Sequence, residues 1–536
     1  MKTLPILPSR AGVAAIGEQL RFSALRTPNK IALQLTSGAT RTYSEFDERS
    51  NRLANALLAQ GFAKGTRIAI WLNNVLEYLD AYMACAKAGF VVVQINIRHK
   101  ASEARYQLEN SGAQALIYCD MVAPLIDHLG ISGDFLLISV GKEIVRKTFD
   151  FEDFVDLGAN RMPVSPEDDD LLVIGYTSGT TGFPKGAELT HRSVKTLGST
   201  NAITNRYVLA STQVFGLSLS FTAGIPAHVL THIYVGGTTV LLDDWDTELL
   251  VDSIDRYKAT FTIIPSPPIV EFCEIVNKAP EKISTLVAAL HSSSKAPPEH
   301  LELLVNTIGP RLVEGWGMTE NSGGLLAATR VSDYVNKRAN IFESTGTAAP
   351  DAVIHVVDEE GNILPHDGEA IGQLIAHSGS LASGYWKNPE ASAQSFRDGW
   401  YYTGDLGRID PEGYVYMIDR RPDLILSGGM NVYPSELERV VLAIPGVSQC
   451  AVVGAPHPRW GQTPVAFVTV IDDKVTAQVV RDECKRELAN YKAPSEVRIV
   501  TQLPTNTSGK ILKHELRDLL IAETKAKEKV DPTKGD

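Results

Sequence analysis

The chain has 536 residues, of which 44% are hydrophobic and 21% are charged, and its formal net charge is −12 at pH 7. This length exceeds what one hydrophobic core usually organises, so at least two domains are expected, and the composition is typical of a soluble globular enzyme. The negative balance argues against nucleic acid as a partner, so an anionic ligand would have to be bound by local groups.

Cysteine usage and hydropathy indicate the compartment. The five cysteines are scattered, odd in number and without metal-ligand spacing, which predicts buried thiols in a reducing compartment. The first residues show no secretory signal, and Lys87 interrupts the best apolar run, 81–97. We therefore expect a cytoplasmic protein without an integral membrane segment.

The N-terminal part alternates strand and helix patterns. Thr42, followed by Glu45 three residues later, predicts the start of a helix. Gly89 ends a second helical pattern, 77–88. Such alternation predicts α/β architecture with largely parallel sheets. The predicted strands of this part are 31–35, 67–72 and 115–118.

The most unusual stretch is 176–186, rich in glycine and hydroxyl residues, which follows the strand-like run 171–174. Its backbone N–H groups could turn toward an anion, and Lys185 would add a positive charge. Gly186 after Lys185 excludes a Walker A loop. A flexible linker is the alternative, but we favour a polyphosphate cradle because a buried-looking strand precedes it. Its candidate residues are Thr177, Ser178, Gly179, Thr180, Thr181, Gly182 and Lys185.

Further strands are predicted at 238–242, 260–265 and 286–291, each ending in small or polar residues. Ligands of α/β proteins bind at the carboxyl ends of parallel strands, so 292–297 and 315–320 are site candidates by position. Short β segments with glycine turns then predict an antiparallel module over 352–417. The composition becomes charged near 419–423, where we place a domain boundary.

The stretch 176–186 resembles the signature loop of the acyl-adenylate-forming superfamily, which includes acyl-CoA synthetases, luciferases and the adenylation domains of peptide synthetases. Three further segments resemble that family in the same order, and 454–461 resembles the lid segment of acyl-CoA synthetases. The resemblance covers about 42–517. The three segments are Trp316-Gly317-Met318-Thr319-Glu320, Tyr402-Thr403-Gly404-Asp405 and Thr507-Ser508-Gly509-Lys510-Ile511.

The resemblance implies an α/β fold. It consists of a large N-terminal domain, with two mainly parallel sheets and a small antiparallel β module, and a small mobile α+β C-terminal lid domain. The expected division is a large domain over 1–419, a hinge over 420–423, a lid domain over 424–522 and a charged flexible tail over 523–536.

The resemblance also implies a nucleotide site. Trp316 would stack on adenine, because a flat ring suits a purine face. Asp405 would accept bonds from the ribose hydroxyls, and Arg420 would join it on the ribose or phosphate side. Taken singly, a buried tryptophan and an ordinary turn would be the better interpretation. The other residues expected along the nucleotide are Ala296, Pro297 and Gly317.

The implied reaction is adenylation, in which a carboxylic acid and ATP give acyl-AMP and pyrophosphate, followed by thioester formation with CoA. Thr319 would bind phosphate, and Glu320 would hold Mg²⁺ with Thr177 as a weaker contact. Lys510 would bridge the attacking carboxylate and the α-phosphate, where repulsion between the two anions is greatest. A lone lysine after glycine is more often solvated.

The acyl pocket indicates the kind of acid. Thr222 stands where amino-acid-activating relatives usually carry aspartate, and a buried ammonium without a counter-charge is costly. We therefore expect a fatty, alicyclic or aromatic acid rather than an α-amino acid. Glycines would give the pocket width, although turn chemistry also explains them. The predicted pocket residues are Phe221, Gly224, Gly323, Gly324 and Leu325.

Pro422 occupies the place where relatives have a flexible hinge residue. Proline fixes φ, so we predict that the lid swings through ψ of Pro422 and the torsions of Asp423. Three alternatives stay open: an enzyme that loads a carrier protein, a luciferase-like oxygenase, and a non-catalytic nucleotide-binding protein. The expected partners are the acid, ATP and CoA, with a possible homodimer.

Overall fold

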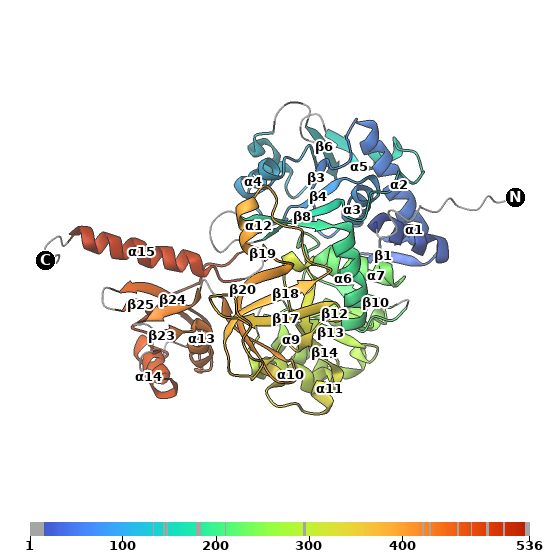
Figure 1. Ribbon diagram of the computed structural model, residues 1–536. Coiled ribbons are helices and arrows are strands. Elements are labelled where there is room, and N and C mark those ends of the chain that lie inside the picture. The colour runs from blue at the N-terminus through green and yellow to red at the C-terminus, as the bar shows by residue number, and fades with distance from the viewer. Residues whose placement is uncertain are drawn as a thin grey trace.

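The computed structural model describes residues 15–530 with short gaps, and it shows a large body with a smaller lobe beside it that carries the C-terminus (Figure 1). For residues 420, 426, 430, 431 and 525–530 only the backbone is described. The gaps are 132, 134, 143–144, 146–147, 178–183, 210, 293–295, 421–422, 428–429, 458–459, 473, 489–491 and 507–509.

The first sheet has seven strands in the order β7-β6-β5-β3-β4-β8-β9, all parallel except the β8–β9 hairpin. Its strands are β3 Arg67–Trp71, β4 Val91–Gln94, β5 Ala115–Cys119, β6 Leu136–Val140, β7 Thr148–Asp150, β8 Leu171–Thr177 and β9 Lys185–Thr190. The helices that follow these strands or flank them are α2 Tyr43–Ala59, α3 Leu76–Ala88, α4 Ala101–Ser111, η1 Ala123–Leu129 and α5 Phe151–Asp156.

The second sheet has nine strands in the order β16-β15-β14-β13-β12-β10-β11-β1-β2 and is parallel from β14 to β1. Its strands are β1 Ile31–Leu35, β2 Thr40–Thr42, β10 Thr212–Phe215, β11 Thr238–Leu241, β12 Phe261–Ile263, β13 Ala288–His291, β14 Leu312–Gly317, β15 Leu325–Ala328 and β16 Thr347–Ala348. The helices of this region are α1 Ile16–Arg26, α6 His191–Thr204, the π-helix η2 Gly224–Val229, α7 Leu230–Tyr234, α8 Thr247–Arg256, α9 Ile269–Lys278, η3 Pro280–Ile283, α10 Pro298–Ile308, η4 Thr319–Asn321, α11 Val331–Val335 and η5 Ile341–Glu343.

An antiparallel sheet and the C-terminal lobe complete the fold. The antiparallel sheet contains β17 Ala352–Val357, β18 Gly372–Ser378, β19 Phe396–Arg397, β20 Trp400–Ile409 and β21 Val415–Arg420, with α12 Pro389–Ser395 beside it. The lobe has its own apolar core and contains β22 Ile425–Ser427, β23 Met430–Val432, β24 Val447–His457, β25 Gly461–Val470, β26 Glu496–Ile499, α13 Pro434–Leu442, α14 Ala477–Glu487 and α15 Lys513–Val530.

The predicted fold class is confirmed by the two mainly parallel sheets, the antiparallel sheet and the C-terminal lobe. The local sequence signals also have the predicted effect. The Thr42 hydroxyl accepts from the Glu45 backbone N–H while the Glu45 side chain accepts from Thr42, so a capping box starts α2. Gly89 ends α3 in the left-handed region at φ 71°. All five cysteines are buried and free, as predicted. In the described part of the chain, no helix is long and apolar enough to span a membrane.

Two expectations differ from the structure. Only 171–174 was expected as a strand before the cradle, but the β8–β9 hairpin also includes Tyr176 and Thr177 and the cradle residue Lys185, because Thr177 pairs with Lys185 across it. A flexible tail was expected from residue 523, but α15 continues to Val530. The bidentate pair of Glu523 with Arg498 holds the helix at that point.

Candidate active site

The predicted phosphate cradle lies at the end of the β8–β9 hairpin. Thr177 Oγ1 donates to the Lys185 carbonyl over 3.3 Å, which closes the base of the turn. Pro184 is held from outside, since its carbonyl accepts from the Tyr106 hydroxyl over 3.0 Å. The other predicted cradle residues, Ser178, Gly179, Thr180, Thr181 and Gly182, lie outside the described residues.

Gly175, just before the cradle, lies where three segments meet. A Cβ there would lie 2.9 Å from Thr222 Oγ1 and 3.1 Å from Thr319 Cγ2. Thr319, the predicted phosphate ligand, and Thr222 of the predicted acyl segment therefore both lie against the β8 backbone. Only glycine permits this approach, and the sequence interpretation missed its role.

Tyr385 connects the cradle to the predicted metal ligand. Its hydroxyl donates to Glu320 Oε1 over 2.7 Å and lies 3.3 Å from the Tyr401 hydroxyl. The Lys185 ammonium lies 5.4 Å from the Tyr385 ring centroid, within cation–π range. Burial, with the Glu320 charge, raises the pKa of Tyr385, so this hydroxyl stays a donor. Tyr385 was not predicted, because no motif marks it and its contacts come from distant segments.

Trp316 and Asp405, the predicted adenine and ribose residues, lie in direct contact. Trp316 Nε1–H donates to Asp405 Oδ2 over 2.9 Å, across 89 residues of chain. Both side chains are buried, with exposed fractions of 7% and 4%. The β20–β21 register places the backbone of Arg420 opposite Asp405. The structure therefore brings these three positions together, while their contacts with a nucleotide stay predictions.

A buried relay fixes the strand ends beside Trp316. His291, the last residue of β13, lies 2.5 Å through Nδ1 from Glu314 Oε2 and 2.8 Å through Nε2 from Ser266 Oγ. Ser266 follows β12, His291 ends β13, and Glu314 is the register partner of His291 within β14. These two contacts of His291 connect the three strands near their carboxyl ends, where the predicted nucleotide-binding segments begin. Of those segments, Ala296 is buried and Pro297 is the residue directly before α10.

The predicted acyl-pocket glycines are closely packed. A Cβ on Gly323 would lie 2.6 Å from Ala223 Cα, and one on Gly324 would lie 1.8 Å from Leu197 Cδ1. The expectation that they widen the pocket is therefore wrong at these two positions, since their missing side chains are replaced by Ala223 and Leu197. A Cβ on Gly224 would lie 3.0 Å from the Ser218 carbonyl oxygen. Their place along an acyl group stays a prediction.

The two other residues of the predicted acyl pocket, Leu325 and Phe221, differ in exposure. Leu325 is buried in β15, with an exposed fraction of 5%. Phe221 is half-buried, and its carbonyl accepts from the Gly224 N–H over 2.8 Å, in the turn that leads into η2. Phe221 can therefore contact a ligand, whereas Leu325 belongs to the packed core.

Lys510 lies on an exposed turn before α15. Its backbone N–H donates to Asn506 Oδ1 over 2.9 Å, and its carbonyl accepts from the Asn506 N–H over 2.9 Å. The amino end of α15 is the end nearer the large body (Figure 1). The position suits a residue that reaches a shared cleft, but its catalytic role stays a prediction.

The predicted hinge is held by side-chain contacts. Pro422 lies outside the described residues. The Asp423 carboxylate pairs with Arg517 of α15. Asp419, just before the hinge, accepts from the backbone N–H of Ser435 in α13 over 3.0 Å. Rotation at Asp423 would therefore have to occur against its contact with α15, and the hinge assignment stays a prediction.

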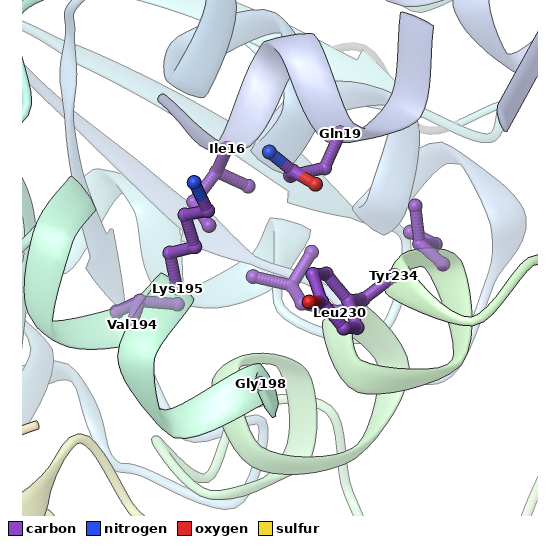
Figure 2. Close-up of a pocket in the computed structure, with 8 residues that line it drawn as sticks. Ile16, Gln19, Val194, Lys195, Gly198, Leu230 and Tyr234 are labelled. Atoms are coloured by element: carbon purple, nitrogen blue, oxygen red, sulfur yellow. The ribbon is translucent and has the colours of Figure 1, made fainter. Parts of the chain in front are cut away.

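A separate pocket lies between α1 and the helices α6 and α7 (Figure 2). Ile16, Val194 and Leu230 line it, with Lys195 and Gln19 also at the pocket. None of the predicted site residues lines this pocket, so it is not part of the candidate active site.

Comparisons with known proteins agree with this arrangement. The AMP-binding enzyme family matches residues 20–386, and the C-terminal domain of that family matches 436–510. A long-chain-fatty-acid–CoA ligase of Mycobacterium tuberculosis is 32% identical over 94% of this chain and 98% of its own. A feruloyl-CoA synthase of Amycolatopsis is 31% identical, over 90% of this chain and 94% of its own.

A solved structure is also similar. The o-succinylbenzoate-CoA synthetase of Bacillus subtilis, in complex with its acyl-adenylate intermediate, superposes with a TM-score of 0.83 and 28% identity, over 96% of this chain and 99% of its own. The chain belongs to the AMP-binding enzyme family, as an acyl-adenylate-forming enzyme of the acyl-CoA synthetase type.

Proposed function

We propose that this enzyme converts a carboxylic acid to its CoA thioester in two steps, with acyl-AMP as the intermediate and pyrophosphate and AMP as by-products. The observation that carries the proposal is the convergence of separate segments on one site. Tyr385 joins Lys185 to Glu320, and Trp316 joins Asp405. These are the groups that the family resemblance assigns to phosphate, metal, adenine and ribose.

The residues fit a Mg²⁺ ion. Glu320 offers carboxylate oxygen and Thr177 offers hydroxyl oxygen, which are the hard ligands that this ion prefers. The hydrogen bond from Tyr385 to Glu320 Oε1 would orient that carboxylate. Bound Mg²⁺ would neutralise charge on the phosphates, and Lys185 would add a fixed positive charge beside them.

Lys510 is the residue we assign to the chemical step. Its ammonium would lie between the carboxylate of the acid and the α-phosphate, where it lowers the repulsion between two anions in the transition state. Because Lys510 belongs to the C-terminal lobe, the lobe would have to bring it to the large domain. Movement about Asp423 would then clear the site for the thiol of CoA.

We propose a fatty, alicyclic or aromatic acid as the substrate. Thr222, a neutral residue, lies against Gly175 at the site, where an aspartate would be needed for an α-ammonium group. The relatives named above act on a long-chain fatty acid and on an aromatic acid, which supports an uncharged acyl body. A cytoplasmic location and a homodimer stay predictions of the sequence.

A substrate screen tests the proposal. The enzyme is incubated with ATP, Mg²⁺, CoA and one acid at a time, and pyrophosphate and the thioester are measured. We expect both products with at least one fatty, alicyclic or aromatic acid, and pyrophosphate alone when CoA is left out. ATP binding without pyrophosphate release over the whole panel would indicate a non-catalytic nucleotide-binding protein. Release of pyrophosphate without a thioester would indicate a different acyl acceptor.

A further inference from the structure

Ser322 adopts a backbone conformation that is unusual for a buried residue. It directly follows the short helix η4, which carries Glu320, and its φ of 55° and ψ of 22° lie in the left-handed region. Seven non-glycine residues that the structure describes have such a positive φ, and among them Ser322 is the buried one, with an exposed fraction of 0%. The others are half-buried or exposed.

This conformation has a physical cost. A side chain at a left-handed position raises the free energy, because its Cβ crowds the neighbouring carbonyl oxygen. Glycine adopts the same backbone without that cost, which is why it commonly ends a helix in this way. If the turn served only to redirect the chain, glycine would be favoured at position 322. The contacts of the serine hydroxyl therefore have to offset the strain.

The Ser322 hydroxyl joins its turn to two other segments of the chain. Its Oγ donates to the carbonyl of Ser380 over 2.8 Å and lies 3.1 Å from Ser193 Oγ. Ser193 belongs to the first turn of α6, where its backbone N–H donates to the capping residue Thr190. Ser193 and Ser380 are buried, with exposed fractions of 3% and 0%. Loss of the hydroxyl would therefore leave buried partners that water cannot readily satisfy.

Asn321, the residue before Ser322, strengthens the same connection. Its Oδ1 accepts from Ser380 Oγ over 2.9 Å. The Glu320 carbonyl accepts from the backbone N–H of Ala382 over 2.7 Å. Three successive residues of the turn are thus bonded to one short segment of the chain.

That segment leads directly to Tyr385, five residues beyond Ser380. Tyr385 donates to Glu320 Oε1 over 2.7 Å, across 65 residues of chain, so this bond depends on how the two segments are held together. The helix α6, to which Ser193 belongs, follows directly on β9, the second strand of the cradle hairpin. Ser322 therefore lies where the predicted metal ligand, its orienting tyrosine and the cradle hairpin are connected.

We propose that Ser322 is a positioning residue for the Glu320 carboxylate. Its hydroxyl, in spite of a strained backbone, fixes the Glu320 turn to the segment that carries Tyr385 and to α6. This inference rests on the proposed function, in which Glu320 binds Mg²⁺. A carboxylate that binds a metal has to be held closely in place, and residues that do not touch the metal provide that support. Ser322 acts only through Glu320.

Two substitutions at this position separate the hydroxyl from the backbone. Ser322→Gly removes the hydroxyl and the strain together, so Tm should change little. Ser322→Ala removes the hydroxyl and keeps the strain, so its Tm should be lower than that of Ser322→Gly. We expect the Mg²⁺ concentration for half-maximal pyrophosphate release to rise about tenfold in both variants. Wild-type Mg²⁺ dependence in Ser322→Gly would overturn the proposal.

Asn340→Gly is the matched control. Asn340 also has a left-handed backbone, at φ 57°, but it is exposed. Glycine there relieves the same kind of strain without removing a contact of Glu320, so the Mg²⁺ dependence should stay at the wild-type value. An equal shift in the control would mean that backbone freedom, rather than the Ser322 hydroxyl, is responsible, and the proposal would fail.

A double substitution tests the route through Tyr385. Tyr385→Phe removes the bond to Glu320 Oε1. Ser322→Gly should have a smaller effect on the Mg²⁺ dependence in that background than in the wild type, because both changes loosen the same carboxylate. A combined shift equal to the product of the two single shifts would contradict the proposal.

Measurements without turnover separate the positioning role from the proposed function. Hydrogen exchange at the Ala382 amide, which bonds the Glu320 carbonyl, should be about fivefold faster in Ser322→Gly and unchanged in Asn340→Gly. Electron paramagnetic resonance should show Mn²⁺, with a non-hydrolysable ATP analogue, bound about tenfold more weakly by Ser322→Gly. Both changes, in an enzyme that releases pyrophosphate with no acid, would support the positioning role while the proposed function fails. Unchanged exchange and Mn²⁺ affinity would refute the positioning role, whether or not the enzyme turns over.

Discussion

The predicted nucleotide face of the large domain and the Lys510 turn of the C-terminal lobe differ in exposure and in the contacts that the structure shows. Trp316, Asp405, Glu320 and Tyr385 are joined in pairs by hydrogen bonds of 2.7–2.9 Å, with Trp316 and Asp405 buried. Lys510 lies on an exposed turn, where its backbone N–H and its carbonyl both bond to Asn506. The first arrangement is preorganised for binding, whereas the second suits a group that is delivered to the site.

The strongest test removes the delivered group. Lys510→Ala should lower the rate of acyl-AMP formation by about 100-fold to 1,000-fold, because the positive charge acts in the transition state. Thioester formation from preformed acyl-AMP should be largely unaffected, which stopped-flow assays of the two half-reactions would measure. Lys474→Ala, at an exposed lysine of the same lobe, is the control. Equal loss in both half-reactions would contradict the assigned role.

The next test weakens the preorganised face. Asp405→Asn keeps an oxygen for the Trp316 Nε1–H bond but removes the charge that would accept the ribose hydroxyls. We expect the KM for ATP to rise about tenfold, with little change in Tm. Titration calorimetry with ATP would measure the loss directly. An unchanged affinity for ATP would show that Asp405 has a structural role only.

A smaller effect is expected at Tyr385. Tyr385→Phe removes the hydrogen bond to Glu320 Oε1 and keeps the ring beneath Lys185. The Mg²⁺ concentration required for half-maximal adenylation should rise by up to about tenfold, because the carboxylate loses its orienting partner. Tyr401→Phe serves as the control, since the Tyr401 hydroxyl contacts Tyr385 rather than Glu320 in the bonds described. Identical Mg²⁺ dependence in wild type and Tyr385→Phe would argue against Glu320 as the metal ligand.

Buried histidines of the large domain predict how the free energy of unfolding depends on pH. Burial lowers the pKa of His191 to about 4 and of His228 and His232 to about 3, all in the large domain, from an ordinary 6.5. Between the lowered pKa values of the folded protein and the ordinary value of 6.5, the unfolded chain binds more protons than the folded one. The free energy of unfolding should therefore fall as the pH drops below about 6.5. Urea unfolding followed by large-domain fluorescence at several pH values would measure this, and His232→Phe should flatten the dependence.

Much of the fold could be predicted from the sequence because the signals were local. The capping box of Thr42 and Glu45 and the glycine that ends α3 depend on neighbouring residues alone. The strand β9 was missed because its pairing with β8, rather than its own composition, makes it a strand. The helical part of the expected tail was missed for a similar reason, since Glu523 is held by Arg498 of β26.

For the site, the sequence by itself predicted which residues would bind the phosphate, the metal and the nucleotide, because these chemistries favour glycine, carboxylate and lysine in short motifs. Only the tertiary structure decided which of them meet. The Trp316–Asp405 bond, the Tyr385 link between Lys185 and Glu320, and the close packing of Gly323 and Gly324 all join segments distant in the chain. Such contacts depend on how sheets and helices pack, and no local pattern encodes them.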